Sequence, residues 1–276
     1  MYKSALVALK PQGANEALTD MAIQLATRQG LQLSALSVID TAVVQPAEAV
    51  PPGATVYKEH KDELLAEETL VAAQEQLDAF TSACSAAGVA CTASLCEGTL
   101  HDQIPLAVQS CDMFLLGNGG EINSEQRADV ARLDSILRHS ARPCLLVPDS
   151  HADVQRVAVA YDGSAQAART LHDFANSGLW AGCAVDIVSI AEDTDVAAGL
   201  AGRAAGYLSQ HDFITQTHPL VAHRDVGLRI VSFVGESGAD ALVIGAYGKT
   251  RWHEFFFGTI TRDVLRGVMV PIFMSH

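Results

Sequence analysis

Three glycines and a threonine near the end of the chain are spaced as a phosphate-binding loop requires. Gly245 and Gly248 close an apolar run, and after nine further residues Gly258 and Thr259 open a stretch with helical periodicity. Glycines let the backbone approach a ligand, and a helix N-terminus offers unpaired N–H groups at the positive end of its dipole. Glycines are also common at plain strand–loop–helix joints, where Thr259 would be an N-cap. These residues alone leave both interpretations open.

A second group with useful chemistry follows the apolar run at residues 157–161. Asp162, Gly163 and Ser164 place a carboxylate and a hydroxyl at the end of this run. Such side chains could hydrogen-bond a ligand that lies beyond the end of a strand. The same triplet is equally typical of a turn that leads into a helix N-cap.

Several other kinds of site are excluded by spacing. The GKT at 248–250 suggests a P-loop, but that motif needs glycine where the chain has Val243. His253 and Glu254 are adjacent and do not share a face, and the six cysteines fit no zinc pattern, so we predict no metal site. No possible nucleophile occurs together with a base in a sequence pattern typical of a catalytic site, and we predict no catalytic residue.

The chain also repeats itself. Residues 111–117 correspond to 239–245 at an offset of 128, whereas 4–11 correspond to 156–163 at an offset of 152. A fixed-period repeat is strong evidence about architecture. The difference, 152 minus 128, is a net insertion of 24 residues in the first half, which we place at 41–65. Because this segment holds three prolines and no clean period, we expect an extended loop.

Each half alternates short apolar runs with amphipathic ones. This pattern is typical of a parallel sheet with helices on both faces. We therefore expect an α/β fold with two tandem doubly wound parallel five-stranded sheets, at residues 1–149 and 150–276. The linker at 147–153 is short, so the domains should pack together. Strands are expected at 3–9, 31–38, 90–96, 112–117, 143–148, 157–161, 185–190, 213–221, 241–245 and 271–274.

The spacing GxxG-x9-G[ST] after a fourth strand, together with Asp-Gly-Ser after a first strand, resembles the nucleotide-binding signature of the universal stress protein family. Ala239-Asp240 before the fourth strand and Pro271 before the fifth add to the resemblance. It covers both halves, so the chain resembles a tandem universal stress protein. The resemblance implies a Rossmann-like, adenine-nucleotide alpha-hydrolase-like fold, with ATP, accompanied by Mg²⁺, as the cofactor.

The resemblance also implies a role for each matching residue. Asp162 would bind the adenosine end, and the backbone around Ile190 would meet the adenine edge. The other implied nucleotide-binding residues, from the turn to the outer phosphates, are Gly163, Ser164, Gly245, Gly248, Gly258, Thr259 and Thr261. The chain departs from the family at Arg224, where many relatives have a glycine, as residues 96–100 of the first half do.

The first half has lost the corresponding groups. In place of Asp162, Gly163, Gly258 and Thr259 it has Lys10, Pro11, Val130 and Ala131. The carboxylate, the close-approach glycine and the phosphate hydroxyl are thus missing, and a branched valine would block a phosphate. We predict that the first half keeps the fold without the site, so that one ATP binds per chain.

The composition of the chain and its apolar edge strands limit the kinds of partner that we expect. A net charge of −14 disfavours nucleic acid, whose phosphates would be repelled. No apolar run is long enough to span a bilayer and no secretory signal is evident, so we expect a cytoplasmic protein without a membrane partner. The apolar fifth strands, at 144–148 and 272–275, need cover, and we expect them to lie together as an intramolecular pseudo-dimer, with a further homodimer left open.

These observations favour a stress-response protein that binds ATP, or another adenine nucleotide, in its second half and acts as a nucleotide-gated binder rather than an enzyme. Two alternatives stay open. One is an interaction or regulatory module that binds no nucleotide. The other is a slow ATPase, because hydrolysis assisted by Mg²⁺ and an aligned water needs few protein groups.

Overall fold

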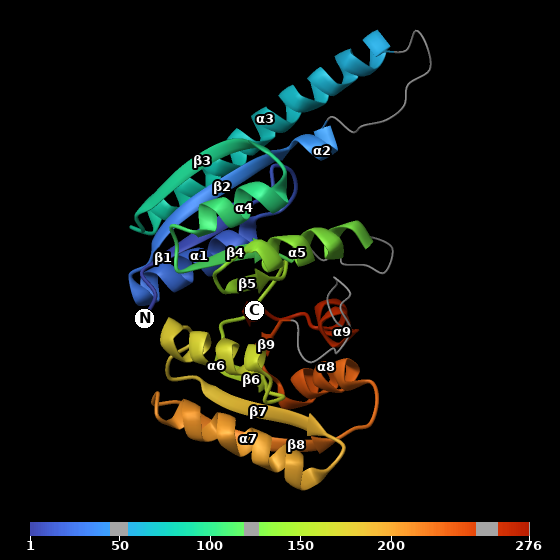
Figure 1. Cartoon of the computed structure of the whole chain (residues 1–276). Helices are drawn as coiled ribbons and strands as arrows, with labels where there is room; N and C mark the ends of the chain where they lie inside the picture. Colours follow the sequence, from blue (N-terminus) through green and yellow to red (C-terminus); the bar gives the residue numbers. More distant parts are fainter. Residues whose placement is uncertain (45–54, 119–126, 247–258, 276) are drawn as a thin grey trace.

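Ten strands form one continuous sheet in the computed structural model, which describes residues 1–44, 55–118, 127–246 and 259–275. The strand order is β3-β2-β1-β4-β5-β10-β9-β6-β7-β8, and Figure 1 shows the two halves one above the other along this sheet. Neighbouring strands within each half are parallel. The expected α/β fold with two doubly wound sheets is confirmed, and the two sheets are joined edge to edge.

The elements alternate along the chain as the apolar and amphipathic runs predicted. Those of the first half are β1 (Ser4–Leu9), α1 (Glu16–Gln29), β2 (Gln32–Asp40), α2 (Thr41–Val44), α3 (Thr55–Ala86), β3 (Cys91–Gly98), α4 (Leu100–Val108), β4 (Met113–Gly117), α5 (Arg127–His139) and β5 (Cys144–Val147). Those of the second half are β6 (Arg156–Ala160), α6 (Ala165–Ser177), β7 (Ala184–Ala191), α7 (Thr194–Ser209), β8 (Ile214–Val221), α8 (Val226–Ser237), β9 (Ala241–Gly245), α9 (Thr259–Gly267) and β10 (Ile272–Ser275).

Helices cover both faces of the sheet because successive strand residues point to opposite faces. In β1, for example, Val7 belongs to one hydrophobic core and Leu6 to the other. The first core holds residues of α1, α3, α6 and α7, and the second holds residues of α4, α5, α8 and α9. In each half the helices therefore change face after the third strand, as right-handed crossovers of a doubly wound sheet require.

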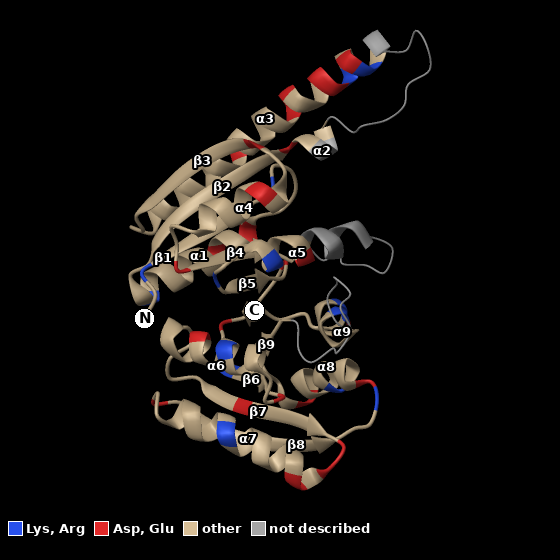
Figure 2. Ribbon diagram, viewed as in Figure 1, with Lys and Arg blue, Asp and Glu red and all other residues tan. Residues whose placement is uncertain are grey.

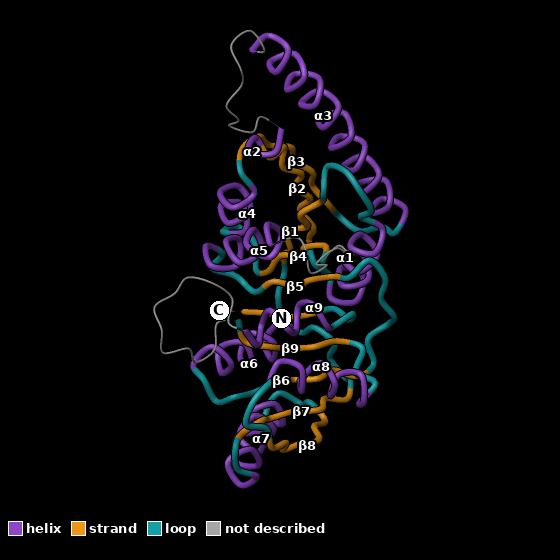
Figure 3. The backbone as a smooth tube through the Cα atoms, turned by 90° about the vertical axis from the view of Figure 1, so that its right-hand side faces the viewer, coloured by secondary structure: helices purple, strands orange, loops and turns teal. Residues whose placement is uncertain are grey.

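The two halves meet where β5 and β10 pair antiparallel. Leu145 pairs with Phe273, and Cys144 pairs with Met274. Both strands are buried throughout, and Leu145 and Phe273 belong to a core that contains residues of both halves. Figure 3 follows the strands from β3 at one end of the molecule to β8 at the other. The prediction that the fifth strands lie together within the chain is confirmed.

The prediction of an extended loop at 41–65 is wrong. α2 begins directly after β2, and α3 starts at Thr55 and runs for 32 residues. Residues that favour helix follow the last proline, and Lys58 and Asp62 form an ion pair at 3.6 Å one turn apart. The three prolines all fall within 45–54, outside the described residues. α3 projects beyond the sheet, with acidic side chains along the projecting part (Figures 1 and 2).

Among the helices in the described ranges, none is both long and apolar enough to cross a bilayer.

Candidate functional site

The strand order places a switch point between β6 and β9. β7 and β8 lie on one side of it, and β10 lies on the other. Ligands of doubly wound sheets bind beyond the carboxyl ends of the strands at such a point. Residues 162–164 follow β6, and Gly245 ends β9 beside it, since Ala160 pairs with Ile244. The structure thus brings the predicted turn and the first predicted glycine to the same edge.

Asp162 and Ser164 build the turn that starts α6. Asp162 Oδ1 accepts a hydrogen bond from the Ser164 N–H at 2.8 Å, and Ser164 Oγ accepts one from the Ala167 N–H at 3.1 Å, as an N-cap does. The turn interpretation of this triplet therefore holds. The second carboxylate oxygen, Asp162 Oδ2, accepts no hydrogen bond from the described residues and is left for a ligand.

Gly163 is needed for two reasons. Its φ of +71° lies in the left-handed region that favours glycine. A Cβ at this position would also lie 2.5 Å from Cδ2 of Leu200, on α7. The turn is therefore held under α7, which limits how far the carboxylate of Asp162 can move.

The backbone at Ile190 faces the same edge. Val188 O accepts a hydrogen bond from the Tyr161 N–H at 3.0 Å, whereas Ala191 O accepts one from the Ala222 N–H at 3.0 Å. Because backbone groups alternate sides along a strand, the N–H and C=O of Ile190 point to the β6 side, as those of Val188 do. β6 has ended at Ala160, so no strand pairs with them there. An adenine edge could take that place.

Gly245 has a packing function whether or not a ligand is present. A Cβ there would lie 2.9 Å from Ala167 N, 3.0 Å from Ala167 Cα and 3.1 Å from Gln166 C, all backbone atoms of α6. The glycine therefore lets the first turn of α6 lie directly against the end of β9. Its implied position beside the ribose and α-phosphate stays a prediction.

Two threonines in the first turn of α9 differ in exposure. Thr259 is exposed, whereas Thr261 is only 4% exposed. α9 also packs tightly on α8 at Gly227, where a Cβ would lie 3.0 Å from the Ile260 carbonyl oxygen. Of the two threonines, Thr259 is the one whose hydroxyl can reach a phosphate in solvent.

Two glycines of the predicted phosphate loop, Gly248 and Gly258, lie outside the described residues, as does His253. The roles of the two glycines stay predictions.

Arg224 follows the third strand of the second half. It stands one residue before Asp225, the N-cap of α8, just as Gly98 stands one residue before Thr99, the N-cap of α4. The two residues are equivalent relative to the following helix, but Gly98 still belongs to β3, whereas β8 ends at Val221, before Arg224. The Arg224 side chain is exposed.

An ionic cluster that the sequence analysis missed lies nearer the amino ends of the strands. Asp186, 2% exposed, accepts hydrogen bonds from Arg156 Nη1 at 2.7 Å and from His218 Nε2 at 2.9 Å. Burial opposes its charge, but these bonds outweigh burial and hold the pKa of Asp186 below its ordinary value. Because the cluster is away from the switch point, we interpret it as structural. Within the described ranges, no three His, Cys, Asp or Glu side chains gather as a metal site.

Comparison with solved structures agrees with this architecture. A universal stress protein from Archaeoglobus fulgidus superposes with a TM-score of 0.71, at 18% identity, over 98% of this chain and 95% of the other. A putative universal stress protein from Pseudomonas aeruginosa superposes with a TM-score of 0.61, at 15% identity, over 99% and 93% of the two chains. At these identities the match establishes the fold.

Sequence comparison establishes the family. A curated universal stress protein from Synechocystis is 30% identical over 165 residues, which span 58% of this chain and 56% of that relative, so the chain matches little more than half of it. The model of the universal stress protein family matches residues 1–148 and again residues 153–276. The tandem resemblance is thereby confirmed, and the chain belongs to the universal stress protein family.

Proposed function

We propose that residues 150–276 bind one adenine nucleotide, ATP with Mg²⁺, at the edge formed by the ends of β6, β7 and β9. The observation that carries the proposal is the unused hydrogen-bonding capacity at this edge. Asp162 Oδ2 has no partner among the described residues, and the backbone groups of Ile190 point past the end of β6. Adenosine supplies what they lack, because its ribose hydroxyls are donors and its adenine edge offers a donor beside an acceptor.

The phosphates would extend toward α9. Thr259 is exposed at the start of this helix, where free N–H groups and the helix dipole favour an anion. Gly248 and Gly258 would complete the loop by close approach, as the resemblance implies. Thr261, although in the same turn, would support the helix from inside rather than touch a phosphate.

We propose further that the bound nucleotide, rather than its hydrolysis, is the signal. Rate acceleration needs interactions that strengthen in the transition state. Ser164 is already engaged in the cap of α6, and the free oxygen of Asp162 is assigned to the adenosine end rather than to the phosphates. A helix N-terminus stabilises ground state and transition state alike. ATP would thus act by favouring one conformation of the protein for which it has the higher affinity.

The substitution Asp162→Asn tests the site without dismantling the turn. Asparagine keeps an oxygen for the Ser164 N–H but removes the negative charge from the ligand side. A hydrogen bond to a charged group contributes about 1.5–3 kcal/mol, so ATP affinity measured by isothermal titration calorimetry should fall by roughly tenfold or more. Lys10→Met, at the equivalent position of the first half, is the matched control and should leave ATP binding unchanged. Equal affinity of wild type and Asp162→Asn would contradict the proposal and favour a module that uses no nucleotide.

A further inference from the structure

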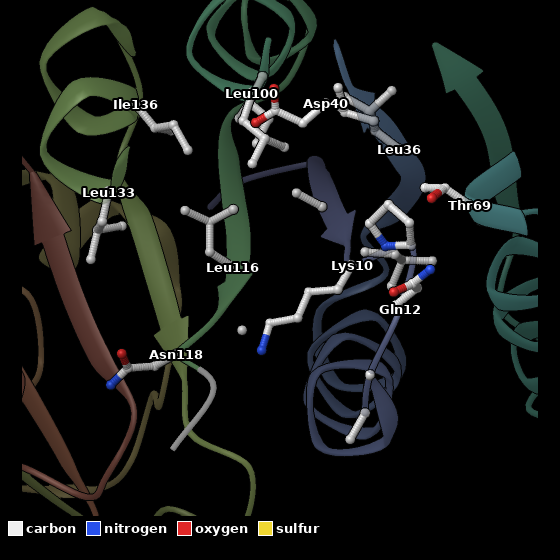
Figure 4. Close-up of a pocket in the computed structure, with 18 of the residues that line it drawn as sticks. Lys10, Gln12, Leu36, Asp40, Thr69, Leu100, Leu116, Asn118, Leu133 and Ile136 are labelled. Atoms are coloured by element: carbon white, nitrogen blue, oxygen red, sulfur yellow. The ribbon is translucent and has the colours of Figure 1, made fainter. Parts of the chain in front are cut away.

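The first half contains a cavity of about 650 Å³ at its own switch point, between the ends of β1 and β4. Its walls are largely aliphatic, as Figure 4 shows, and six of the side chains that form them are Leu36, Val38, Leu100, Ile104, Leu116 and Ile136. No aromatic or arginine side chain is among its described lining residues, so none of these residues offers an aromatic ring or a guanidinium plane to stack on a purine. The cavity has the size and apolar character typical of small-molecule sites.

The insertion in the first half closes one side of this cavity. Val44 on α2, together with Leu65 and Thr69 on α3, lines it. The second half has no counterpart, since α7 is 16 residues long where α3 has 32. The insertion therefore supplies a wall that the nucleotide site of the second half lacks.

Lys10 places a positive charge on the lining of the cavity. Its side chain extends from the end of β1 toward β4, and its Cε lies 3.8 Å from where a Cβ on Gly117 would be (Figure 4). Its ammonium forms no ion pair with any residue in the described ranges. The two carboxylates that line the cavity, Asp40 and Asp149, each have another interaction already.

Asn118 also lines the cavity and carries an unsatisfied group, but Figure 4 shows its side chain pointing away from Lys10. Its backbone N–H donates to Val147 O at 2.6 Å, and its buried side-chain Oδ1 has no hydrogen-bond partner among the described residues. Lys10, rather than this acceptor, therefore forms the charged end of an otherwise apolar cavity.

We propose that this cavity binds an aliphatic carboxylic acid, with its chain among the leucine and isoleucine side chains and its carboxylate on Lys10. The second half has Asp162 where the first has Lys10, so the sign of the charge at this position selects the ligand: a carboxylate accepts hydrogen bonds from a ribose, and an ammonium binds an acid. The first half has exchanged the nucleotide for another ligand rather than lost all binding, and this inference does not depend on ATP binding in the second half.

Calorimetric titration of the whole chain with decanoate and with decanol tests the proposal. Decanoate should bind at least roughly tenfold more tightly than decanol, because only the acid forms a charge-assisted hydrogen bond with Lys10. Lys10→Met keeps an unbranched stem and should erase the difference between acid and alcohol, and Leu100→Phe should weaken the binding of both by filling the cavity.

Asp162→Asn separates this site from the nucleotide site. It should leave decanoate binding unchanged while weakening ATP. Decanoate binding that is absent, that equals decanol binding, or that survives Lys10→Met unaltered would overturn the proposal. Displacement of decanoate by ATP from the Asp162→Asn protein would also overturn it, by showing that the first half binds nucleotide.

Discussion

Gly117 and Gly245 occupy the same place in the repeat, the last position of the fourth strand, yet the structure predicts opposite responses to alanine. A Cβ at Gly245 would lie within 2.9–3.1 Å of three backbone atoms of α6. At Gly117 the nearest atoms would be side-chain carbons of Lys10 and Leu18, at 3.8 and 4.0 Å, which are ordinary contacts. Neither glycine has a positive φ, so only space distinguishes the two sites.

The magnitude follows from two opposing effects. Replacing glycine by alanine restricts the unfolded chain and stabilises the fold by about 0.4–1 kcal/mol where the backbone allows it. Forcing a methyl group into close-packed backbone costs about 1–3 kcal/mol. The first effect is shared by both sites and cancels in the comparison. Gly245→Ala should therefore be less stable than Gly117→Ala by about 1–3 kcal/mol.

Urea unfolding followed by far-UV circular dichroism, without nucleotide, measures this difference. Gly117→Ala should unfold at or slightly above the wild-type midpoint, and Gly245→Ala clearly below it, with equal slopes. Equal midpoints for the two variants would refute the reasoning. They would show that α6 is not held against the end of β9. The glycine at position 245 would then be explained by ligand binding rather than by packing.

Two further predictions concern charge and turnover. Because the pKa of Asp186 is lowered in the folded state, its contribution to stability is present above the unfolded value of about 3.9 and is lost as pH falls through the folded value. Urea unfolding measures the difference in stability between wild type and Asp186→Asn. The advantage of wild type should be full at about pH 6 and should shrink below about pH 4. An advantage that stays the same down to acid unfolding would contradict this. Phosphate release from Mg²⁺–ATP should be negligible and unaffected by His253→Ala, whereas sustained release at about 1 s⁻¹ or faster that the variant loses would make the protein an ATPase.

The sequence predicted the sheet well because strands buried on both faces are apolar throughout. β9 was expected at 241–245 and has these bounds, and α9 begins at Thr259, where a helical stretch was expected. The internal repeat also predicted the pairing of β5 with β10, since two equivalent apolar edges in one chain can cover each other. α3 was missed in part because the prolines just before it have no helical period, although the charged stretch that follows favours a helix.

The parts that the sequence could not predict depend on register and on distances between elements. Arg156, Asp186 and His218 lie about 30 residues apart and meet only because β6, β7 and β8 are neighbours in this register. The cavity at Lys10 depends on how far α4 and α5 stand from the sheet, which no periodicity encodes. The burial of Thr261 likewise follows from the packing of α9 on α8.

The central claim is that the two halves share a fold but differ in their nucleotide site, and the number of ATP molecules bound per chain tests it most directly. Equilibrium titration of the nucleotide-free chain with Mg²⁺–ATP should give one equivalent. Gly258→Val, which copies the residue at the corresponding position of the first half, should give none. Two equivalents would show that Lys10 and its neighbours still permit nucleotide binding, and no binding by the wild type would contradict the site at β6, β7 and β9.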